Sequence, residues 1–229
     1  MAKKVEHKHE LLENSDALKE KLVVAESWIE QNPKPVIGIA AAVLLVVGGY
    51  FGFTYYKNNQ NVAAQKDMFQ AVYYFEADSL NLALNGDGNN LGFLAIIEDY
   101  GITDAGNLAN YYAGASYLKQ GKYELARLYL EDFSSSDLLV QARAYSLTGD
   151  AYMEEKNYEE AARFYSKASN YKPNKYFSPT YLMKEALAYE KLNQNDKAKE
   201  AYDKIINQYW DSSEYNNARK FKARLESNS

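Results

Sequence analysis

The sequence contains no cysteine and only two histidines, His7 and His9. Without cysteine the chain cannot form a disulfide framework, a thiolate zinc site or a cysteine nucleophile. Both histidines flank Lys8 with no further ligand nearby, so we expect no metal site there. The rest of the chain lacks the imidazole on which most acid–base and metal chemistry depends. We therefore expect a protein that is not an enzyme and that needs no cofactor.

The chain also lacks an excess of basic residues. Its 26 Lys and Arg face 31 Asp and Glu, which gives a formal net charge of −5. Nucleic-acid-binding proteins usually carry a basic surface that neutralises phosphates, so we expect no nucleic-acid partner. Proline is scarce too, with four residues, while the 47% of hydrophobic and 25% of charged residues are ordinary for a folded domain. This composition favours a folded, largely helical protein.

One long apolar segment divides the chain. Residues 36–56 contain no charged side chain, and as a helix they would be ~31 Å long, which matches a hydrocarbon core of roughly 30 Å. Lys34 and Lys57 bracket the segment, and aromatic residues gather at its C-terminal end, as at a membrane interface. A buried core helix is the alternative, but such helices are usually shorter, and a cleaved signal peptide would begin nearer the N-terminus. We predict a transmembrane helix over 35–57, in contact with membrane lipid.

The span contains four glycines, which would let a second membrane helix approach its backbone closely. Glycine is also ordinary in membrane helices, so both interpretations stay open. The four positions are Gly38, Gly48, Gly49 and Gly52.

Residues 1–34 are predicted to form a cytoplasmic tail with a short amphipathic helix. Apolar residues recur there at helical spacing, Asn14 or Ser15 is a suitable cap, and Pro33 would stop the helix. Such a helix would lie on the membrane surface or on a partner, or would simply be solvated. Slightly more lysines precede the span than follow it, which favours a cytoplasmic N-terminus and an exported C-terminal domain. The reverse topology, with a cytoplasm-facing scaffold or receptor, is the alternative.

After the span the sequence repeats. Residues 142–175 follow the 34-residue tetratricopeptide pattern of two antiparallel helices. Gly149 and Ala161 are small where the two helices would touch, and Tyr165 would fill the space beside that contact. Pro173 would end the second helix.

Two further copies fit the same pattern, over 107–140 and 179–212. The last copy is the weaker one, because Trp210 occupies the place of the closing proline. Residues after 212 are expected to form a charged C-terminal capping helix, which makes 107–229 the repeat domain. The predicted fold class is therefore all-α, a single N-terminal transmembrane helix followed by a tetratricopeptide-like helical-hairpin solenoid.

Residues 58–106 are predicted to be a helical connector that does not fit the repeat. Within it, 85–90 read Asn-Gly-Asp-Gly-Asn-Asn, which resembles the start of a calcium loop. The sixth place of such a loop should be glycine and is Asn90, and the twelfth should be an acid and is Ile96. We interpret this stretch as a glycine turn.

Helical-hairpin arrays bind partners in a groove lined by the first helix of each hairpin. The usual inward places predict this groove to be lined by Tyr111, Leu118, Lys119, Arg143, Ser146, Asp150, Met153, Met183 and Glu190. Tyrosine, methionine and single charges suit an extended or helical apolar segment. A clamp for a C-terminal carboxylate is not supported, because Tyr111 and Ala115 stand where its Lys and Asn would be.

Acidic pairs are the remaining candidates for catalysis. Glu154 with Glu155, and Glu159 with Glu160, lie on helix faces that should be exposed. A solvated run of charges explains them without any chemistry.

The order of short tail, single span, helical connector and three repeat copies resembles the YfgM family. Residues 92–130 resemble the version found in Bacteroidota, and they read GFLAIIEDYGITDAGNLANYYAGASYLKQGKYELARLYL. The resemblance implies a single-pass inner-membrane protein with a periplasmic repeat domain. It further implies an ancillary subunit of the Sec translocon channel that joins a membrane-anchored periplasmic chaperone of the peptidyl-prolyl isomerase type. Emerging secreted polypeptides are the further partners that it implies.

Overall fold

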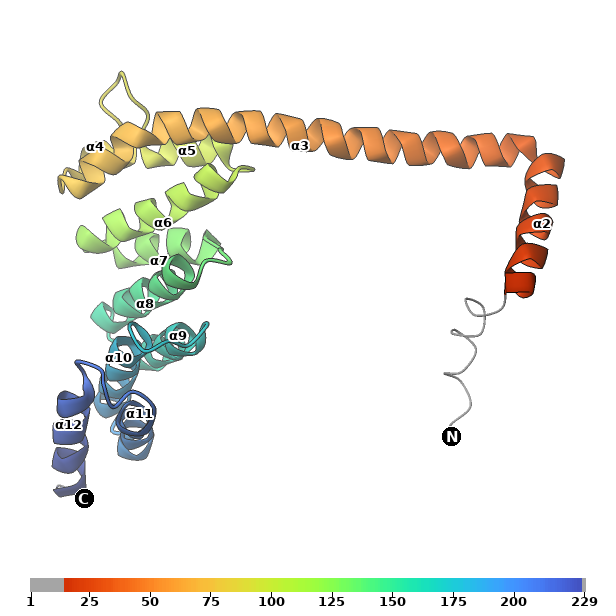
Figure 1. Cartoon of the computed structure of the whole chain (residues 1–229). Helices are drawn as coiled ribbons and strands as arrows, with labels where there is room; N and C mark the ends of the chain where they lie inside the picture. Colours follow the sequence, from red (N-terminus) through yellow and green to blue (C-terminus); the bar gives the residue numbers. More distant parts are fainter. Residues whose placement is uncertain (1–14, 228–229) are drawn as a thin grey trace. The chain divides into compact units, whose positions relative to one another are not determined.

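The computed structural model describes residues 15–227. Within that range the chain forms helices joined by turns and loops, and it forms no β-strand (Figure 1). In chain order the helices are α2 (Ser15–Gln31), α3 (Pro33–Glu76), α4 (Leu80–Asn85), α5 (Phe93–Tyr100), α6 (Asp104–Lys119), α7 (Tyr123–Asp132), α8 (Leu138–Glu154), α9 (Tyr158–Asn170), α10 (Ser178–Lys191), α11 (Asn195–Gln208) and α12 (Tyr215–Ser227). The chain forms two compact units, Met1–Tyr56 and Lys57–Ser229. The predicted all-α class is confirmed.

The first unit contains α2 and the apolar part of α3. Helix α2 begins at Ser15, one of the two suggested caps, and ends at Gln31, before Pro33. Pro33 opens α3, where a missing N–H costs nothing because the first turn has no partner for it. The other suggested cap, Asn14, and both histidines lie outside the described residues.

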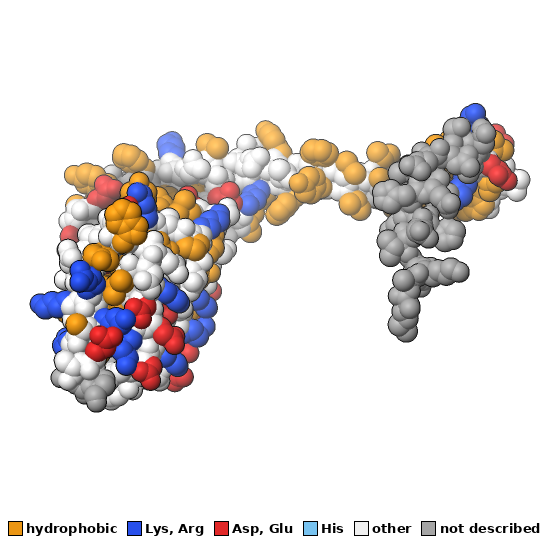
Figure 2. Space-filling view, turned by 60° about the horizontal axis from the view of Figure 1, so that its bottom comes forward, with side chains coloured by type: hydrophobic (Ala, Val, Ile, Leu, Met, Phe, Trp, Pro, Cys, Tyr) orange, Lys and Arg blue, Asp and Glu red, His pale blue; other side chains and the backbone are white. Residues whose placement is uncertain are grey.

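Helix α3 is long and apolar enough to cross a membrane, and none of its most apolar stretch is buried. Figure 2 shows hydrophobic side chains along this stretch, and Leu45 is 76% exposed. Such a surface is unfavourable in water, so this stretch is a candidate membrane span. A Cβ atom added at any of the four glycines of the span would meet no atom within 4 Å, so packing inside the chain does not explain them.

Helix α3 continues without a break from Pro33 to Glu76, past the predicted end of the span at residue 57. Its last turns belong to the second unit, where Met68 and Ala71 are buried. The ring of Phe75, near the C-terminus of α3, lies 5.3 Å from that of Tyr112 on α6, and Phe93 on α5 stacks on the same tyrosine at 5.2 Å. The predicted connector therefore shares one apolar core with the first repeat.

The turn after α4 is built around one carboxylate. Asp87 accepts hydrogen bonds from the backbone N–H groups of Asn89 and Asn90, at 2.8 and 2.7 Å, and from the hydroxyl of Tyr74 at 2.7 Å. The Tyr74 hydroxyl, followed by the amides of Asn90 and Asn89, lowers the pKa of Asp87 well below its usual range. Gly86 and Gly88 both adopt positive φ angles, as a glycine turn requires.

Three helical hairpins follow, α6 with α7, α8 with α9, and α10 with α11, and α12 packs on the last (Figure 1). A Cβ atom at Gly149 would lie 2.7 Å from the ring of Tyr165, and Ala161 is fully buried. Gly114 on α6 has the same role, since its Cβ would lie 2.9 Å from the carbonyl oxygen of Ala126. The predicted close contact between the helices of each pair is therefore present at both glycines.

Candidate protein-binding site

The candidate site is the face formed by the first helices of the hairpins, α6, α8 and α10. A lysine of α10 joins it to α8, because Lys184 Nζ lies 2.8 Å from both carboxylate oxygens of Asp150. The same nitrogen lies 3.3 Å from the hydroxyl of Ser146. Two of the predicted groove residues thus contact the next repeat directly.

Asp150 also binds the second helix of its own hairpin. The hydroxyl of Tyr165 donates a hydrogen bond of 2.7 Å to Asp150 Oδ1. Burial raises the pKa of Tyr165 far above its usual value, and the charge of Asp150 adds to this effect. The raised pKa keeps this tyrosine a neutral hydrogen-bond donor near neutral pH. Asp150 consequently holds three helices together, α8, α9 and α10.

Beside Asp150 the site has a hollow of about 340 Å³, which we call the inner hollow. The four helices of the first two hairpins, α6 to α9, all contribute to its wall. The lining residues are Leu118, Tyr123, Asp150, Met153, Glu154 and Tyr165. Leu118 and Met153 supply apolar surface and Glu154 an exposed acid. The structure thus brings three predicted groove residues together, Leu118, Asp150 and Met153, at a volume that suits apolar side chains of a bound segment.

A second part of the same face is aromatic and basic. Burial raises the pKa of Tyr111 on α6, and the positive charge of Arg143 on α8 partly opposes this rise. Arg143 acts in the same way on Tyr181 of α10, whose pKa burial also raises. Arg143 is exposed, so one accessible cation lies near two tyrosine hydroxyls from neighbouring repeats.

Three predicted groove residues lie outside these two clusters. Lys119 Nζ pairs with Asp78 at 2.8 Å and lies 5.0 Å above the ring of Phe75, so it binds the connector. Met183 packs on the core between α10 and α12. Glu190 accepts a 2.6 Å hydrogen bond from the Tyr202 hydroxyl and pairs with Arg224 of α12. Their part in binding a partner stays a prediction.

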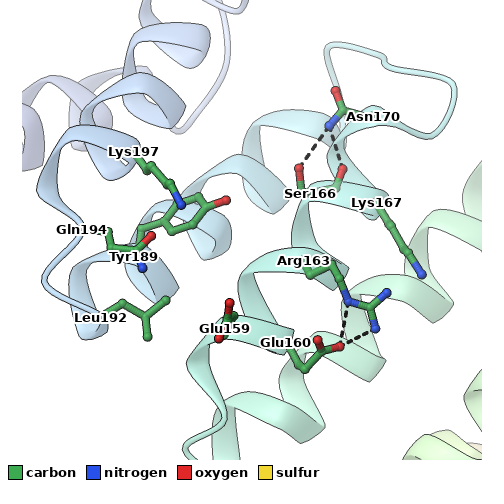
Figure 3. A pocket seen from close by; sticks show the side chains of 10 residues that line it. All are labelled: Glu159, Glu160, Arg163, Ser166, Lys167, Asn170, Tyr189, Leu192, Gln194 and Lys197. Atoms are coloured by element: carbon green, nitrogen blue, oxygen red, sulfur yellow. Dashed lines mark hydrogen bonds and ion pairs between the residues drawn. The ribbon is translucent and has the colours of Figure 1, made fainter.

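A larger hollow of about 580 Å³ lies elsewhere in the same unit, between α9 and the α10–α11 turn (Figure 3). Arg163 Nε binds Glu160 at 2.7 Å, and Lys197 lies 5.4 Å from the ring of Tyr189. Four charged residues of this hollow, Glu160, Arg163, Lys167 and Lys197, therefore already contact one another or a ring. Tyr189 and Leu192 give it an apolar part, but none of the predicted groove residues lines it, and we therefore regard it as the weaker candidate.

Sequence reasoning missed Lys184, Tyr123 and Glu154 as members of the site. A signal for Lys184 was present, because it follows Asp150 by 34 residues, the length of one repeat. Opposite charges at that separation lie on neighbouring hairpins. Within residues 15–227 the structure shows no cluster of three or more His, Asp or Glu that could hold a metal ion.

Comparison with protein families supports this geometry. Residues 111–174 match a model of the tetratricopeptide repeat, and residues 181–212 match a second model of the same repeat. The second unit contains tetratricopeptide repeats. The first match covers most of the predicted copies 107–140 and 142–175, and the second covers the copy 179–212. No curated protein matches the chain.

Proposed function

We propose that this protein is a membrane-anchored interaction module, in which the apolar part of α3 crosses a membrane and the repeats bind another protein. One observation supports this above all others. A helix with an entirely exposed apolar stretch and a set of tetratricopeptide repeats occur in the same chain. Arrays of this kind bind protein segments in their inner groove.

The residues around the inner hollow indicate which kind of protein segment would bind there. Leu118 and Met153 would contact an apolar side chain, and the flexible Met153 can adapt to different shapes. Arg143 would face an acidic group of the ligand, and Glu154 a basic one. An extended or helical apolar segment with a few charges therefore fits the site best.

The finer proposal is that the protein is an ancillary subunit of the Sec translocon in a bacterial inner membrane. The resemblance of residues 92–130 and of the whole layout to the YfgM family supports it. In this proposal the tail is cytoplasmic and the repeats are periplasmic. The repeats bind a membrane-anchored chaperone of the peptidyl-prolyl isomerase type and meet emerging secreted polypeptides.

Purification of the tagged full-length protein in a mild detergent tests the proposal. We expect the translocon channel and the membrane-anchored chaperone to co-purify, and mass spectrometry would identify both. Recovery of neither, from membranes in which both are abundant, contradicts the translocon assignment. Fusion of a phosphatase that is active only in the periplasm tests the topology. An inactive phosphatase at the C-terminus would favour the cytoplasm-facing scaffold instead.

A further inference from the structure

One edge of the second unit, which we call the loop edge, exposes large hydrophobic side chains at every level. The loop edge consists of four loops, at 101–103, 133–137, 171–177 and 209–214, with the first residues of the helices that follow. The middle two join one hairpin to the next, the first leads from α5 into the first hairpin, and the last leads from the third hairpin to α12. Its exposed hydrophobic residues are Ile102, Leu138, Leu139, Tyr176, Phe177 and Trp210. Tyr176 is 75% exposed and Trp210 is 70% exposed, so neither is accounted for by packing within the chain.

The opposite ends of the hairpins are different. The turns inside the three hairpins, at 120–122, 155–157 and 192–194, are all described, and they expose no large hydrophobic side chain. Their exposed residues are glycine, lysine, glutamate and asparagine. The first turns of the helices that follow add one exposed large hydrophobic residue, Leu125 at 38%. Single exposed apolar residues are normal on a protein, but their concentration at one of two edges, with exposures up to 75%, is not.

The loop edge is one continuous surface, because hydrogen bonds and an ion pair connect each level of it to the next. Asn107, at the start of α6, exchanges two hydrogen bonds with the backbone of Ser134, at 2.8 and 3.1 Å. The Tyr171 hydroxyl donates to the carbonyl of Ser135 at 2.9 Å. The next connection is the ion pair of Lys175 with Asp211 at 3.1 Å. The exposed hydrophobic residues are therefore held at a common edge.

The same edge contains the residue at which the chain leaves the apolar span. Lys57 directly follows Tyr56 in the sequence, and its Nζ pairs with Asp104 at 2.9 Å. One turn further, Asn61 accepts a 2.9 Å hydrogen bond from the N–H of Ala105. Asp104 and Ala105 come immediately after the first loop, which contains Ile102. The loop edge is thus fastened to the membrane-proximal end of α3 in the second unit.

From these observations we infer that the loop edge contacts the lipid surface on the side of the membrane where the repeats lie. This inference rests on the proposed membrane anchor. Tryptophan and tyrosine favour the membrane interface because their rings are apolar and their tips are polar. The anchor keeps the edge close to the bilayer, so a contact that would be weak between separate molecules is favoured by its high effective concentration.

The contact is apolar rather than electrostatic. The edge lysines Lys57 and Lys175 are paired with Asp104 and Asp211, and Lys172 donates to the carbonyl of Ser136 at 2.6 Å. These lysines are therefore not an unpaired basic patch for anionic lipid. The contact should therefore form on zwitterionic lipid. It should also persist at about 0.5 M salt, where the Debye length is only a few ångströms.

Spin labels on single cysteines test this inference, because the chain has no native cysteine. Spin-labelled cysteines replace Ile102 and Tyr176 on the loop edge, one in each variant. In the matched control variants they replace Lys122 and Asn195 at the opposite edge. A label at Leu45 reports the span itself. The full-length protein is placed in phosphatidylcholine nanodiscs, and each label's collisions with oxygen, which concentrates in lipid, and with a water-soluble nickel complex are measured.

We expect the ratio of oxygen to nickel collisions to be several-fold higher at residues 102 and 176 than at the two controls. Equal ratios at both edges, with a deep reading at residue 45, would overturn the lipid contact and leave the anchor intact. An aqueous reading at residue 45 would instead show that the anchor itself is absent. Loss of both kinds of collision at residues 102 and 176 would mean that protein covers the edge, which also overturns the inference.

Discussion

Lys184 follows Asp150 by 34 residues and places its nitrogen 2.8 Å from both oxygens of that carboxylate. Two other contacts have the same separation. Arg224 pairs with Glu190, and the hydroxyl of Thr180 donates to Glu214 at 2.7 Å. Because the repeat is itself 34 residues long, the first pair connects corresponding parts of the second and third hairpins, and the other two connect α10 with α12 and the loop before it. The three contacts fix how the second hairpin, the third hairpin and α12 are placed on one another.

The Lys184–Asp150 pair should contribute measurably to stability. A double-mutant cycle with Lys184→Met and Asp150→Asn should give a coupling free energy of about 1 kcal/mol, because the pair is partly buried and shares Ser146 and Tyr165 as neighbours. Urea unfolding of the full-length protein in detergent would measure it. The pair Lys199–Asp196, in which the acid is 94% exposed, is the control and should give less than about 0.5 kcal/mol. Equal couplings would contradict the assigned role.

Gly149 should not tolerate a larger side chain. Gly149→Val would force atoms against the ring of Tyr165, which is itself buried, so we expect a loss of about 1–3 kcal/mol in the free energy of unfolding. The control is Glu159→Val, which introduces the same side chain at an exposed helical position and should cost much less. A shift of the urea midpoint that is no larger for Gly149→Val would show that the two helices can move apart freely.

Glu185 should make stability depend on pH. This residue is 4% exposed, and burial raises the pKa of its carboxyl above 4.5, while hydrogen bonds from Ser166 and Ser169 and the charge of Lys204 oppose the rise. Below the pKa of the unfolded chain both states are protonated. Above it the unfolded chain ionises while the folded protein still holds its proton, so stability falls until the pH has risen through the folded-state pKa.

Glu185→Gln removes this ionisation. We therefore expect the variant to gain stability relative to the natural chain at pH 7 compared with pH 4, as followed by thermal unfolding. Ser169→Ala removes a donor that lies 3.2 Å from the carboxylate, so it should make the pH dependence steeper. A constant difference between the Gln variant and the natural chain from pH 4 to pH 7 would contradict this account.

Charge reversal in the groove should weaken partner binding. Arg143→Glu places an acid near Tyr111 and Tyr181, and we expect several-fold lower recovery of the partner in detergent pull-downs. Lys220→Glu on α12 makes the same change in net charge at another exposed position and should leave recovery unchanged. Circular dichroism would verify that both variants stay helical. Undiminished recovery with Arg143→Glu would indicate that the partner binds elsewhere.

The glycines of the span should matter for association and not for insertion. Gly48 and Gly52 are four residues apart and so lie on one face of α3. Gly48→Leu with Gly52→Leu should reduce co-purification of a membrane partner and leave the protein resistant to carbonate extraction. Val43→Leu with Val47→Leu changes another face and serves as the control. Equal effects of the two pairs would assign the glycines to ordinary membrane composition.

Much of the fold follows from local sequence. Gly149, Ala161 and Tyr165 occupy fixed places of a repeat, so a single hairpin already shows why each is small or aromatic. The apolar span is equally local, because its length and lack of charge need no knowledge of the rest.

Other features depend on residues far apart in sequence. The rings of Phe75, Phe93 and Tyr112 meet in one core although no repeat pattern relates them, so the connector looked independent of the first hairpin. The loop edge could not be predicted from the sequence either, because Ile102 or Trp210 taken alone is an ordinary exposed residue. Their alignment arises only when the hairpins stack. The identity of the partner also depends on the partner's own surface, about which this sequence carries no information.

Helix α12 covers the apolar face of the last hairpin. Ala218 and Leu225 cover the apolar surface around Tyr202 and Ile205, while Arg224 satisfies the carboxylate of Glu190. Without α12 the last hairpin would expose that apolar surface to water, so a chain truncated after Ser212 should aggregate even with every repeat intact. We therefore expect α12, which is 13 residues long, to be needed for the solubility of the repeats that precede it.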